Sequence, residues 1–337
     1  MAADAPNARR CAVLALTKGG CDQGRRLAES LHGDFFACKG RLAEVFAQVW
    51  REYQEIVCIM ATGIVIRTIA PLLEDKYRDP AIVVCDEQGK FAISLLSGHL
   101  GGANRLADVV ATHTGGQAVL TTASDVLGLT ALDLWCRDLK LIIGDKDAFT
   151  KAMGRLVDQG LLNIWSSYPL PPLPPDLQTV ADPEEADLII AARTEGPVKG
   201  ALLHPKSLVI GIGCNRGTPK ADIARAVAAT CAQHQLASEA IARLASIDLK
   251  QDEEGLLEFA RSHDLALDFF SSDQLNQVEE VSTSLAVLKA TGAKGVAEPA
   301  ALLSAGPGST LLIPKMKWTD VTTAVAEMSD PLGRQVV

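Results

Sequence analysis

A short glycine-rich stretch between residues 97 and 104 carries the side chains best suited to chemistry in this sequence. Its histidine has an ordinary pKa near 6.5, so it can take up or release a proton at neutral pH. A serine, an asparagine and bare glycine backbone around it can donate hydrogen bonds to a ligand that approaches closely. The candidate site residues in this stretch are Ser97, Gly98, His99, Gly101, Gly102 and Asn104.

The same stretch has a plainer interpretation, as a tight connection between a strand and a helix. Glycine-rich turns of this kind are common in α/β proteins and need not bind anything. His99 is flanked by residues too small to bury it, which favours a role in chemistry. A covalent nucleophile is the less favoured role for Ser97, because no nucleophile-elbow pattern surrounds it.

Hydrophobic patterns predict the elements that hold this stretch. Apolar runs at 81–85 and 91–96 predict a β-hairpin whose loop contains a glycine. Apolar residues at helical spacing follow residue 104. The stretch therefore lies where a strand gives way to a helix. A second marked turn follows a predicted strand at 56–60 and supplies Gly63 and Arg67 as candidate substrate contacts.

A second glycine-rich turn, Gly211–Thr218, lies between a predicted strand and a predicted helix. It has one residue too many between its last two glycines for a dinucleotide fingerprint, so an NAD-dependent oxidoreductase is a disfavoured alternative. We favour a carboxylate site built from backbone amides, the helix N-terminus and a guanidinium. The other alternative is that this turn is only the start of a helix, whose glycines allow close packing and bind no ligand. The candidate contacts are Gly213, Asn215, Arg216, Gly217 and Thr218.

Composition limits the classes of partner. The chain has 337 residues, a net charge of −9 and no basic tract, which argues against nucleic acid. No apolar run approaches the roughly 20 residues that span a bilayer, and the N-terminus lacks the apolar core of a secretory signal. We therefore expect a cytoplasmic protein without membrane contacts. The eight cysteines form no C-x-x-C pair, so neither a disulfide framework nor a zinc site is expected. Cys11, Cys58 and Cys85 lie in or beside apolar runs and are predicted to be buried thiols.

Strand–loop–helix units open near residues 11 and 208. We predict an α/β fold with two outer α/β/α sandwich-like domains, 1–130 and 206–337, joined by a small α/β middle domain, 131–205. The first helix is expected at 24–31. The middle domain contains a proline-rich stretch, 168–175, which predicts an extended surface loop rather than a motif for a proline-recognising partner.

The run from Met60 to Asn104 resembles the CbiG family of cobalamin-biosynthesis proteins, the cobalt-precorrin-5A hydrolases of the anaerobic corrin pathway. The resemblance covers most of the chain from Thr17 onward. Asn215 departs from the family pattern, in which this turn often has a basic residue. The matching segments include 61–64, 69–73, 75–76, 79–81, 97–104, 211–218, 245–250, 296–298 and 314–317.

The resemblance implies a hydrolase acting on carbon–carbon bonds. It would open the ring-A lactone of cobalt-precorrin-5A, release acetaldehyde and form cobalt-precorrin-5B. This chemistry needs a base, donors for an oxyanion and cations for the peripheral carboxylates. We expect His99 to be the base, with Ser97, Asn104 and glycine amides as oxyanion donors. The cobalt belongs to the substrate, so no cofactor is expected. The candidate cations are Arg67, Lys76, Arg216, Lys315 and Lys317.

A non-catalytic corrinoid carrier is the alternative function, with the same anion sites and no base. Glu298 is interpreted as a charge at a helix N-terminus rather than as an acid. The expected partners are a cobalt-corrinoid substrate, a second copy in a homodimer, and other corrin-pathway enzymes in transient contact.

Overall fold

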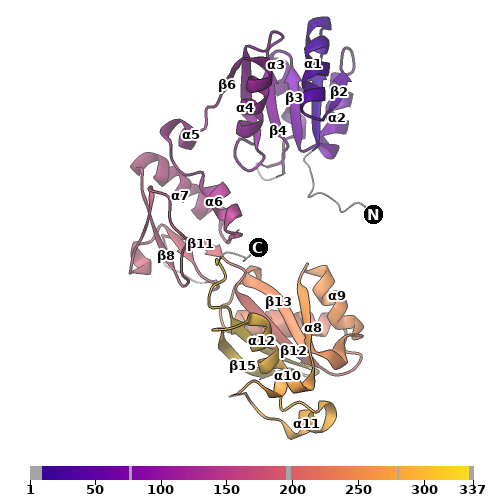
Figure 1. Ribbon diagram of the computed structural model, residues 1–337, viewed down its shortest axis with the longest axis vertical. Helices are drawn as coiled ribbons and strands as arrows, with labels where there is room; N and C mark the ends of the chain where they lie inside the picture. Colours follow the sequence, from indigo (N-terminus) through magenta and orange to yellow (C-terminus); the bar gives the residue numbers. More distant parts are fainter. Residues whose placement is uncertain (1–9, 76–77, 195–198, 280, 334–337) are drawn as a thin grey trace. The chain divides into compact units, whose positions relative to one another are not determined.

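The computed structural model describes residues 10–75, 78–194, 199–279 and 281–333 (Figure 1). It has a mixed α/β fold with three sheets, which confirms the predicted fold class. The chain forms two compact units, residues 1–134 and 135–337, and the second unit contains two of the sheets. The domain boundaries expected at 130 and 205 stay predictions.

The first unit contains a six-stranded sheet in the order β2-β1-β3-β4-β5-β6. Strands β2, β1, β3 and β4 are parallel, β5 is antiparallel to β4, and β6 is parallel to β5. The carboxyl ends of β5 and β6 therefore lie at one edge, opposite to those of β1 and β3. The strands are β1 (Cys11–Ala15), β2 (Asp34–Ala37), β3 (Glu55–Ile59), β4 (Ala81–Cys85), β5 (Phe91–Leu96) and β6 (Gln117–Val119).

Helices cover both faces of this sheet (Figure 1). One face packs against α1 (Lys18–Ser30) and α4 (Ala103–Thr114), the other against α2 (Leu42–Glu52) and α3 (Thr62–Ile69). Strand β1 is buried on both faces, as its unbroken apolar run predicts for a parallel strand. One 3₁₀ turn, Ala70–Leu72, follows α3. Two short helices follow β6, namely α5 (Ala123–Leu127) and α6 (Leu132–Asp138).

Two local predictions in this unit have clear outcomes. The β4–β5 hairpin is confirmed, with Gly89 in the left-handed region at φ +72°. The first helix begins at Lys18 rather than at residue 24, so that prediction is wrong. The hydroxyl of Thr17 accepts a 3.1 Å hydrogen bond from the amide of Gly20 and caps the helix there.

The middle sheet has the order β7-β11-β10-β8-β9, and only β7 is antiparallel to its neighbour. The proline-rich stretch joins β8 to β9 without regular structure. Helix α7 (Lys146–Gln159) and a 3₁₀ turn, Pro183–Glu185, complete this part. The strands are β7 (Ile142–Ile143), β8 (Leu162–Ser166), β9 (Leu177–Thr179), β10 (Leu188–Ile190) and β11 (Ala201–His204).

The C-terminal sheet has the order β14-β13-β12-β16-β15. Strands β12, β13 and β14 are parallel, and β16 is antiparallel to both of its neighbours. Helices α8 (Lys220–Gln233) and α9 (Glu254–Ser262) cover one face, and α12 (Ala297–Ala305) covers the other. The strands are β12 (Leu208–Cys214), β13 (Ile241–Ile247), β14 (Ala266–Phe270), β15 (Thr310–Lys317) and β16 (Val321–Glu327).

The helices of this part are α8 (Lys220–Gln233), α9 (Glu254–Ser262), α10 (Ser272–Asn276), α11 (Leu285–Thr291) and α12 (Ala297–Ala305), with 3₁₀ turns at Ser238–Ala240 and Asp248–Lys250.

A buried tyrosine connects the middle part to the C-terminal sheet. The hydroxyl of Tyr168 donates to Glu327 at 2.6 Å and lies 2.8 Å from Ser207 Oγ. No helix in the described part of the chain is long and apolar enough to cross a membrane.

Candidate functional site

The turn that carries His99 connects β5 to α4 in a constrained conformation. Ser97 has φ +57° and Gly102 has φ +90°, both in the left-handed region. The hydroxyl of Ser97 donates to the backbone carbonyl of Asp79 at 2.9 Å, and its own carbonyl accepts from the amide of Ala103 at 3.1 Å. Ser97 therefore fixes the turn, and its hydroxyl proton is already committed.

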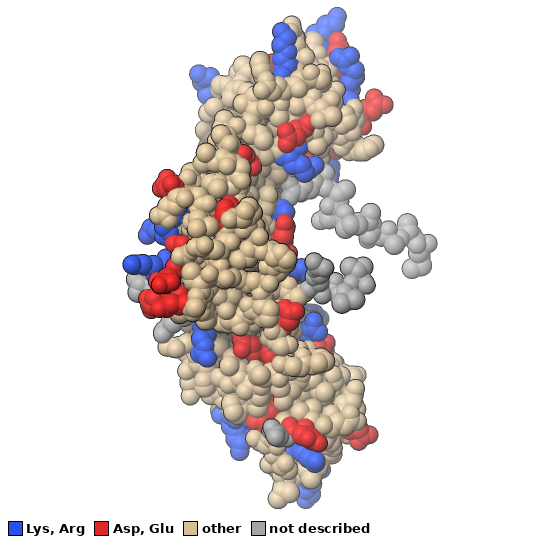
Figure 2. All heavy atoms as spheres, turned by 60° about the vertical axis from the view of Figure 1, so that its left-hand side comes forward, with Lys and Arg blue, Asp and Glu red and all other residues tan. Residues whose placement is uncertain are grey.

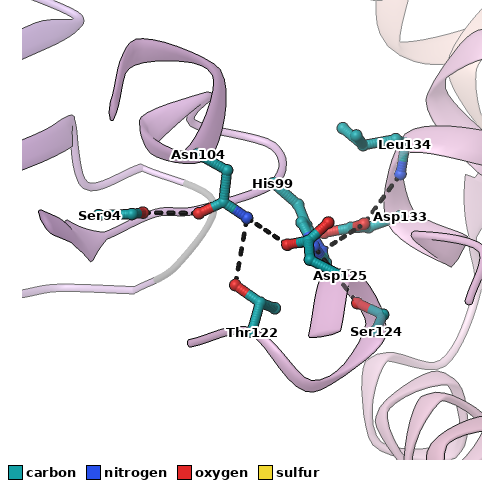
Figure 3. Close-up of polar contacts among 8 residues, drawn as sticks. All are labelled: Ser94, His99, Asn104, Thr122, Ser124, Asp125, Asp133 and Leu134. Carbon is teal, nitrogen blue, oxygen red and sulfur yellow. Dashed lines mark hydrogen bonds and ion pairs between the residues drawn. The ribbon is translucent and has the colours of Figure 1, made fainter. Parts of the chain in front are cut away.

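His99 lies between two carboxylates (Figure 3). Its Nε2 is 3.1 Å from Asp125 Oδ2, and its Nδ1 is 3.3 Å from Asp133 Oδ1. Ser124 Oγ lies 3.4 Å from the same Nε2. The side chain of His99 is 13 % exposed, so these contacts are partly shielded from water.

The two carboxylates favour the charged form of the imidazole. The hydrogen bond to Asp133 has the largest effect in raising the pKa of His99 above its usual value, and Asp125 raises it further. Burial acts in the opposite direction but is outweighed. Each ring nitrogen lies within reach of a carboxylate oxygen, and only the protonated ring can donate from both nitrogens at once. The contacts with Asp133 and Asp125 therefore favour the charged imidazole more than water does.

Asn104 is buried and orients Asp125. Its amide nitrogen donates to Asp125 Oδ2 at 2.5 Å and to Thr122 Oγ1 at 3.1 Å, and its amide oxygen accepts from Ser94 at 2.6 Å. The carboxylate can only accept, so it determines which way the amide points. Both amide protons are engaged, which leaves none for the oxyanion role expected of Asn104.

Two glycines of this turn face the protein itself. A Cβ on Gly98 would lie 2.7 Å from the side-chain oxygen of Asn104, and one on Gly101 would lie 2.7 Å from the carbonyl oxygen of Ser97. These close approaches explain both glycines without a ligand. Substrate contact by Gly98, Gly101 and Gly102 stays a prediction.

The structure does not bring Gly63 or Arg67 to His99. Gly63 and Arg67 follow β3, whose carboxyl end lies at the sheet edge opposite to that of β5. The guanidinium of Arg67 donates to the carbonyl of Gly63 at 3.0 Å, which closes one turn of α3. Lys76 lies outside the described residues. Substrate contact by any of the three stays a prediction.

The second glycine-rich turn binds carboxylates of the protein itself. The amide of Gly217 donates to Glu253 Oε1 at 2.5 Å, and the ammonium of Lys250 donates to Glu253 Oε2 at 3.1 Å. Glu253 is only 3 % exposed. The guanidinium of Arg216 pairs with Asp252 at 2.5 Å on the surface. The groups expected to converge on a substrate carboxylate therefore converge on Asp252 and Glu253.

Close packing accounts for the first glycine of that turn. A Cβ on Gly211 would lie 1.8 Å from the carbonyl oxygen of Ala297, so α12 could not approach β12 as it does. The hydroxyl of Thr218 donates to the carbonyl of Asn215 at 2.9 Å. The side-chain amide of Asn215 donates to Asp320 Oδ1 at 2.8 Å, and its backbone amide donates to the carbonyl of Asp320 at 3.0 Å. These contacts hold the turn against β16.

Four of the C-terminal candidates line one cavity of about 370 Å³: Gly213, Asn215, Lys315 and Lys317. Lys250 and Trp318 line it too, and neither was predicted. Arg216, Gly217 and Thr218 are absent from its described lining. Glu298 is buried and accepts from the amides of Ser282 and Lys315, at 2.6 and 2.8 Å. Glu298 therefore holds the backbone at Ser282 and Lys315, in addition to being the helix-end charge that we expected.

Two carboxylates that contact the imidazole, those of Asp125 and Asp133, were not predicted from the sequence. Asp125 could have been found, because it follows the short strand β6, and β6 is parallel to β5. The carboxyl ends of parallel neighbours meet at one edge. Asp133 has no comparable signal, since only the path of the chain through α6 brings it back to His99.

The described residues contain no group of three or more His, Cys, Asp or Glu side chains placed to hold a metal ion. On the face drawn in Figure 2, Lys and Arg lie scattered among Asp and Glu, with no continuous basic stripe over the described residues of that face. That pattern agrees with the acidic composition.

These features define a class of protein: a multi-sheet α/β protein with a carboxylate-paired histidine at one sheet edge and a lysine-lined cavity at another. The N-terminal model of the cobalamin synthesis G family matches residues 44–125, and its C-terminal model matches residues 208–326. The chain belongs to the cobalamin synthesis G family, which confirms the resemblance seen in its sequence.

Curated relatives agree with this assignment. A cobalt-precorrin-5A hydrolase of Priestia megaterium is 33% identical, and the match covers 94% of each chain. A cobalt-precorrin-5A hydrolase of Salmonella typhimurium is 34% identical over 89% of this chain and 94% of its own.

A solved structure of a cobalamin biosynthesis protein G homologue from Sulfolobus solfataricus is 22% identical, covers 95% of this chain and 97% of its own, and has a TM-score of 0.39.

Proposed function

We propose that this chain is a cobalt-precorrin-5A hydrolase, which opens the lactone of its cobalt tetrapyrrole and releases acetaldehyde. Two relatives with that name match nearly the whole chain. The observation that carries the proposal in this chain is the imidazole of His99 held between Asp125 and Asp133. A histidine with a neighbouring carboxylate can exchange the protons that ester opening requires.

The two ends of the imidazole have different roles in this proposal. Asp133 is the less exposed carboxylate, at 12 % against 33 % for Asp125. It orients the ring through Nδ1, as a buried carboxylate does in other histidine-based sites. Nε2 and Asp125 form the end that exchanges protons with substrate. Asn104 is a positioning residue, because it holds Asp125 rather than the reacting atoms.

Lactone opening comes first. Water adds to the lactone carbonyl, a water proton passes to Asp125, and His99 protonates the ester oxygen as the C–O bond breaks. In the second step the neutral His99 takes the proton of the freed hydroxyl. The carbon–carbon bond then breaks, acetaldehyde forms, and the electron pair stays on the conjugated macrocycle. Asp125 returns its proton to solvent. His99 is thus the base of the second step.

Cobalt enters with the substrate in this proposal, so the chain needs no cofactor of its own. Turnover that survives dialysis against a chelator would support this, and restoration of lost activity by added metal would refute it. We place the reaction in the cytoplasm. A homodimer and transient contacts with other corrin-pathway enzymes stay predictions, which light scattering and pull-down with those enzymes would test.

The test is turnover. Under anaerobic conditions, purified protein mixed with cobalt-precorrin-5A should release acetaldehyde in proportion to the corrinoid consumed. Tight binding of the corrinoid without aldehyde at any pH would replace the hydrolase with the alternative, a corrinoid carrier.

A further inference from the structure

The cavity of the C-terminal sheet opens where ligands of α/β proteins commonly bind. Gly213 and Cys214 at the end of β12 and Ile247 at the end of β13 line it. The chain leaves β12 on one side through β13 and β14 and returns on the other side as β15 and β16. Ligands bind outside the carboxyl ends of strands where the order reverses in this way. The volume of this cavity, about 370 Å³, is within the range of ligand pockets.

One wall of the cavity is cationic. Lys315 and Lys317 are two positions apart on β15, and both line the cavity. Neither ammonium has an ion-pair partner among the described residues. Lys250 also lines the cavity, but its charge is matched by the buried Glu253. The one acidic side chain in the described lining is Asp320, which accepts a hydrogen bond from Asn215.

Another wall is apolar. It is formed by Ile247 from β13, by Val287 and Ala290 from α11, and by Val296 just before α12. Trp318 also lines the cavity, and its indole N–H donates to the hydroxyl of Thr323 at 3.0 Å. A ligand that fits both walls has an apolar body with anionic groups at its edge.

The cationic groups of the cavity suit carboxylates. Lys315 and Lys317 present separate ammonium groups, which suit separate carboxylates on flexible arms.

We propose that this cavity binds an edge of the corrinoid, with Lys315 and Lys317 on its acetate or propionate carboxylates and the apolar wall against the macrocycle. The inference rests on the proposed function for the identity of the ligand class. A cavity of this volume holds peripheral arms rather than a whole tetrapyrrole. Substrate anchoring is thereby assigned to the C-terminal sheet.

The test uses the full chain and two available corrinoids. Cobyrinic acid carries free carboxylates, whereas cobinamide carries amides in their place. The Lys315→Gln/Lys317→Gln double variant should bind cobyrinic acid about tenfold or more weakly at low salt, and should bind cobinamide unchanged. Lys289→Gln is the matched control, because Lys289 is an exposed lysine of α11 outside the cavity lining. Asp320→Asn should tighten the binding of cobyrinic acid by removing a repulsive charge.

Fluorescence locates the ligand. The chain has four tryptophans, and Trp318 is the one in this cavity lining. Cobyrinic acid should quench the protein's fluorescence, and Trp318→Phe should remove part of that quenching. Equal affinity of the double variant and the unmutated protein for cobyrinic acid, with circular dichroism unchanged, would overturn the proposal.

The same variants separate this inference from the proposed function. If the unmutated protein releases acetaldehyde but the double variant binds and turns over normally, the cavity is not the anchor and the hydrolase stands. If lysine-dependent binding is found but the unmutated protein releases no aldehyde, the anchor stands and the hydrolase fails.

Discussion

The carboxylate of Asp133 lies 3.3 Å from Nδ1 of His99 and has the largest effect in raising the pKa of that histidine. The two residues come from a turn after β5 and from α6, near the limit of the first compact unit. A histidine on an open glycine-rich turn would titrate near its usual value. The pKa of His99 is instead raised by a neighbour that is distant in sequence.

Asp133→Asn should lower the pKa of His99 more than Asp125→Asn does, because the Asp133 hydrogen bond has the larger effect. NMR titration of the imidazole in each variant measures both shifts. Asp138→Asn is the control, since Asp138 lies on the same helix but pairs with Arg137. An equal pKa in the Asp133 variant and the unmutated protein would contradict the contact.

The raised pKa of His99 also predicts how stability depends on pH. A group whose pKa is higher in the folded state stabilises that state fully below its unfolded pKa, near 6.5, and loses this contribution as pH rises through the folded value. The free energy of unfolding of the unmutated protein should therefore exceed that of His99→Gln by the largest margin below about pH 6. This margin should shrink as the pH rises further. Urea denaturation of both proteins across that range measures it. A difference in the free energy of unfolding that grows with pH would contradict the raised pKa of His99.

Glu253→Gln should destabilise the C-terminal sheet by about 1–3 kcal/mol, because Lys250 would lose its buried counter-charge. Glu254→Gln, one residue on and exposed, should have little effect. Chemical denaturation of the two variants gives the comparison. If both variants unfold at the same denaturant concentration, Glu253 does not stabilise the turn.

Gly211→Ala should destabilise the protein by roughly 1–3 kcal/mol or more, because its Cβ would meet the backbone of α12. Gly154→Ala is the opposite case, since Gly154 lies in α7 with nothing within 4 Å of an added Cβ. It should stabilise the protein by about 0.5–1 kcal/mol. Thermal unfolding measures both changes, and a neutral Gly211→Ala would show that α12 can move away from β12.

Local patterns predicted much of the fold. Unbroken apolar runs identified β1, β3 and β4, and the glycine loop identified the β4–β5 hairpin. Strand β2 was missed, because it is a short edge strand whose ends are exposed. The N-terminus of α1 was missed because Gly19 and Gly20 weaken the helical pattern, while the cap at Thr17 compensates.

The candidate site was predictable only in part. His99 and Asn104 stand on one turn, so sequence alone places them together. Their partners depend on tertiary structure, because the polarity of β5 and β6 decides that Asp125 meets His99 and that Arg67 does not. The Gly217 turn was predicted as an anion site, but sequence spacing cannot show that Glu253 already lies there.

The central claim is that the carboxylate-paired His99 carries the proton transfers of a cobalt-precorrin-5A hydrolase. The most direct measurement is acetaldehyde release from cobalt-precorrin-5A by His99→Gln, with bound corrinoid measured in parallel. Glutamine can still donate a hydrogen bond to a carboxylate but cannot exchange a proton, so release should slow by about 10²–10⁴-fold with little change in binding. His113→Gln, an exposed histidine at the end of α4, should release aldehyde normally. Normal release by His99→Gln would contradict the account.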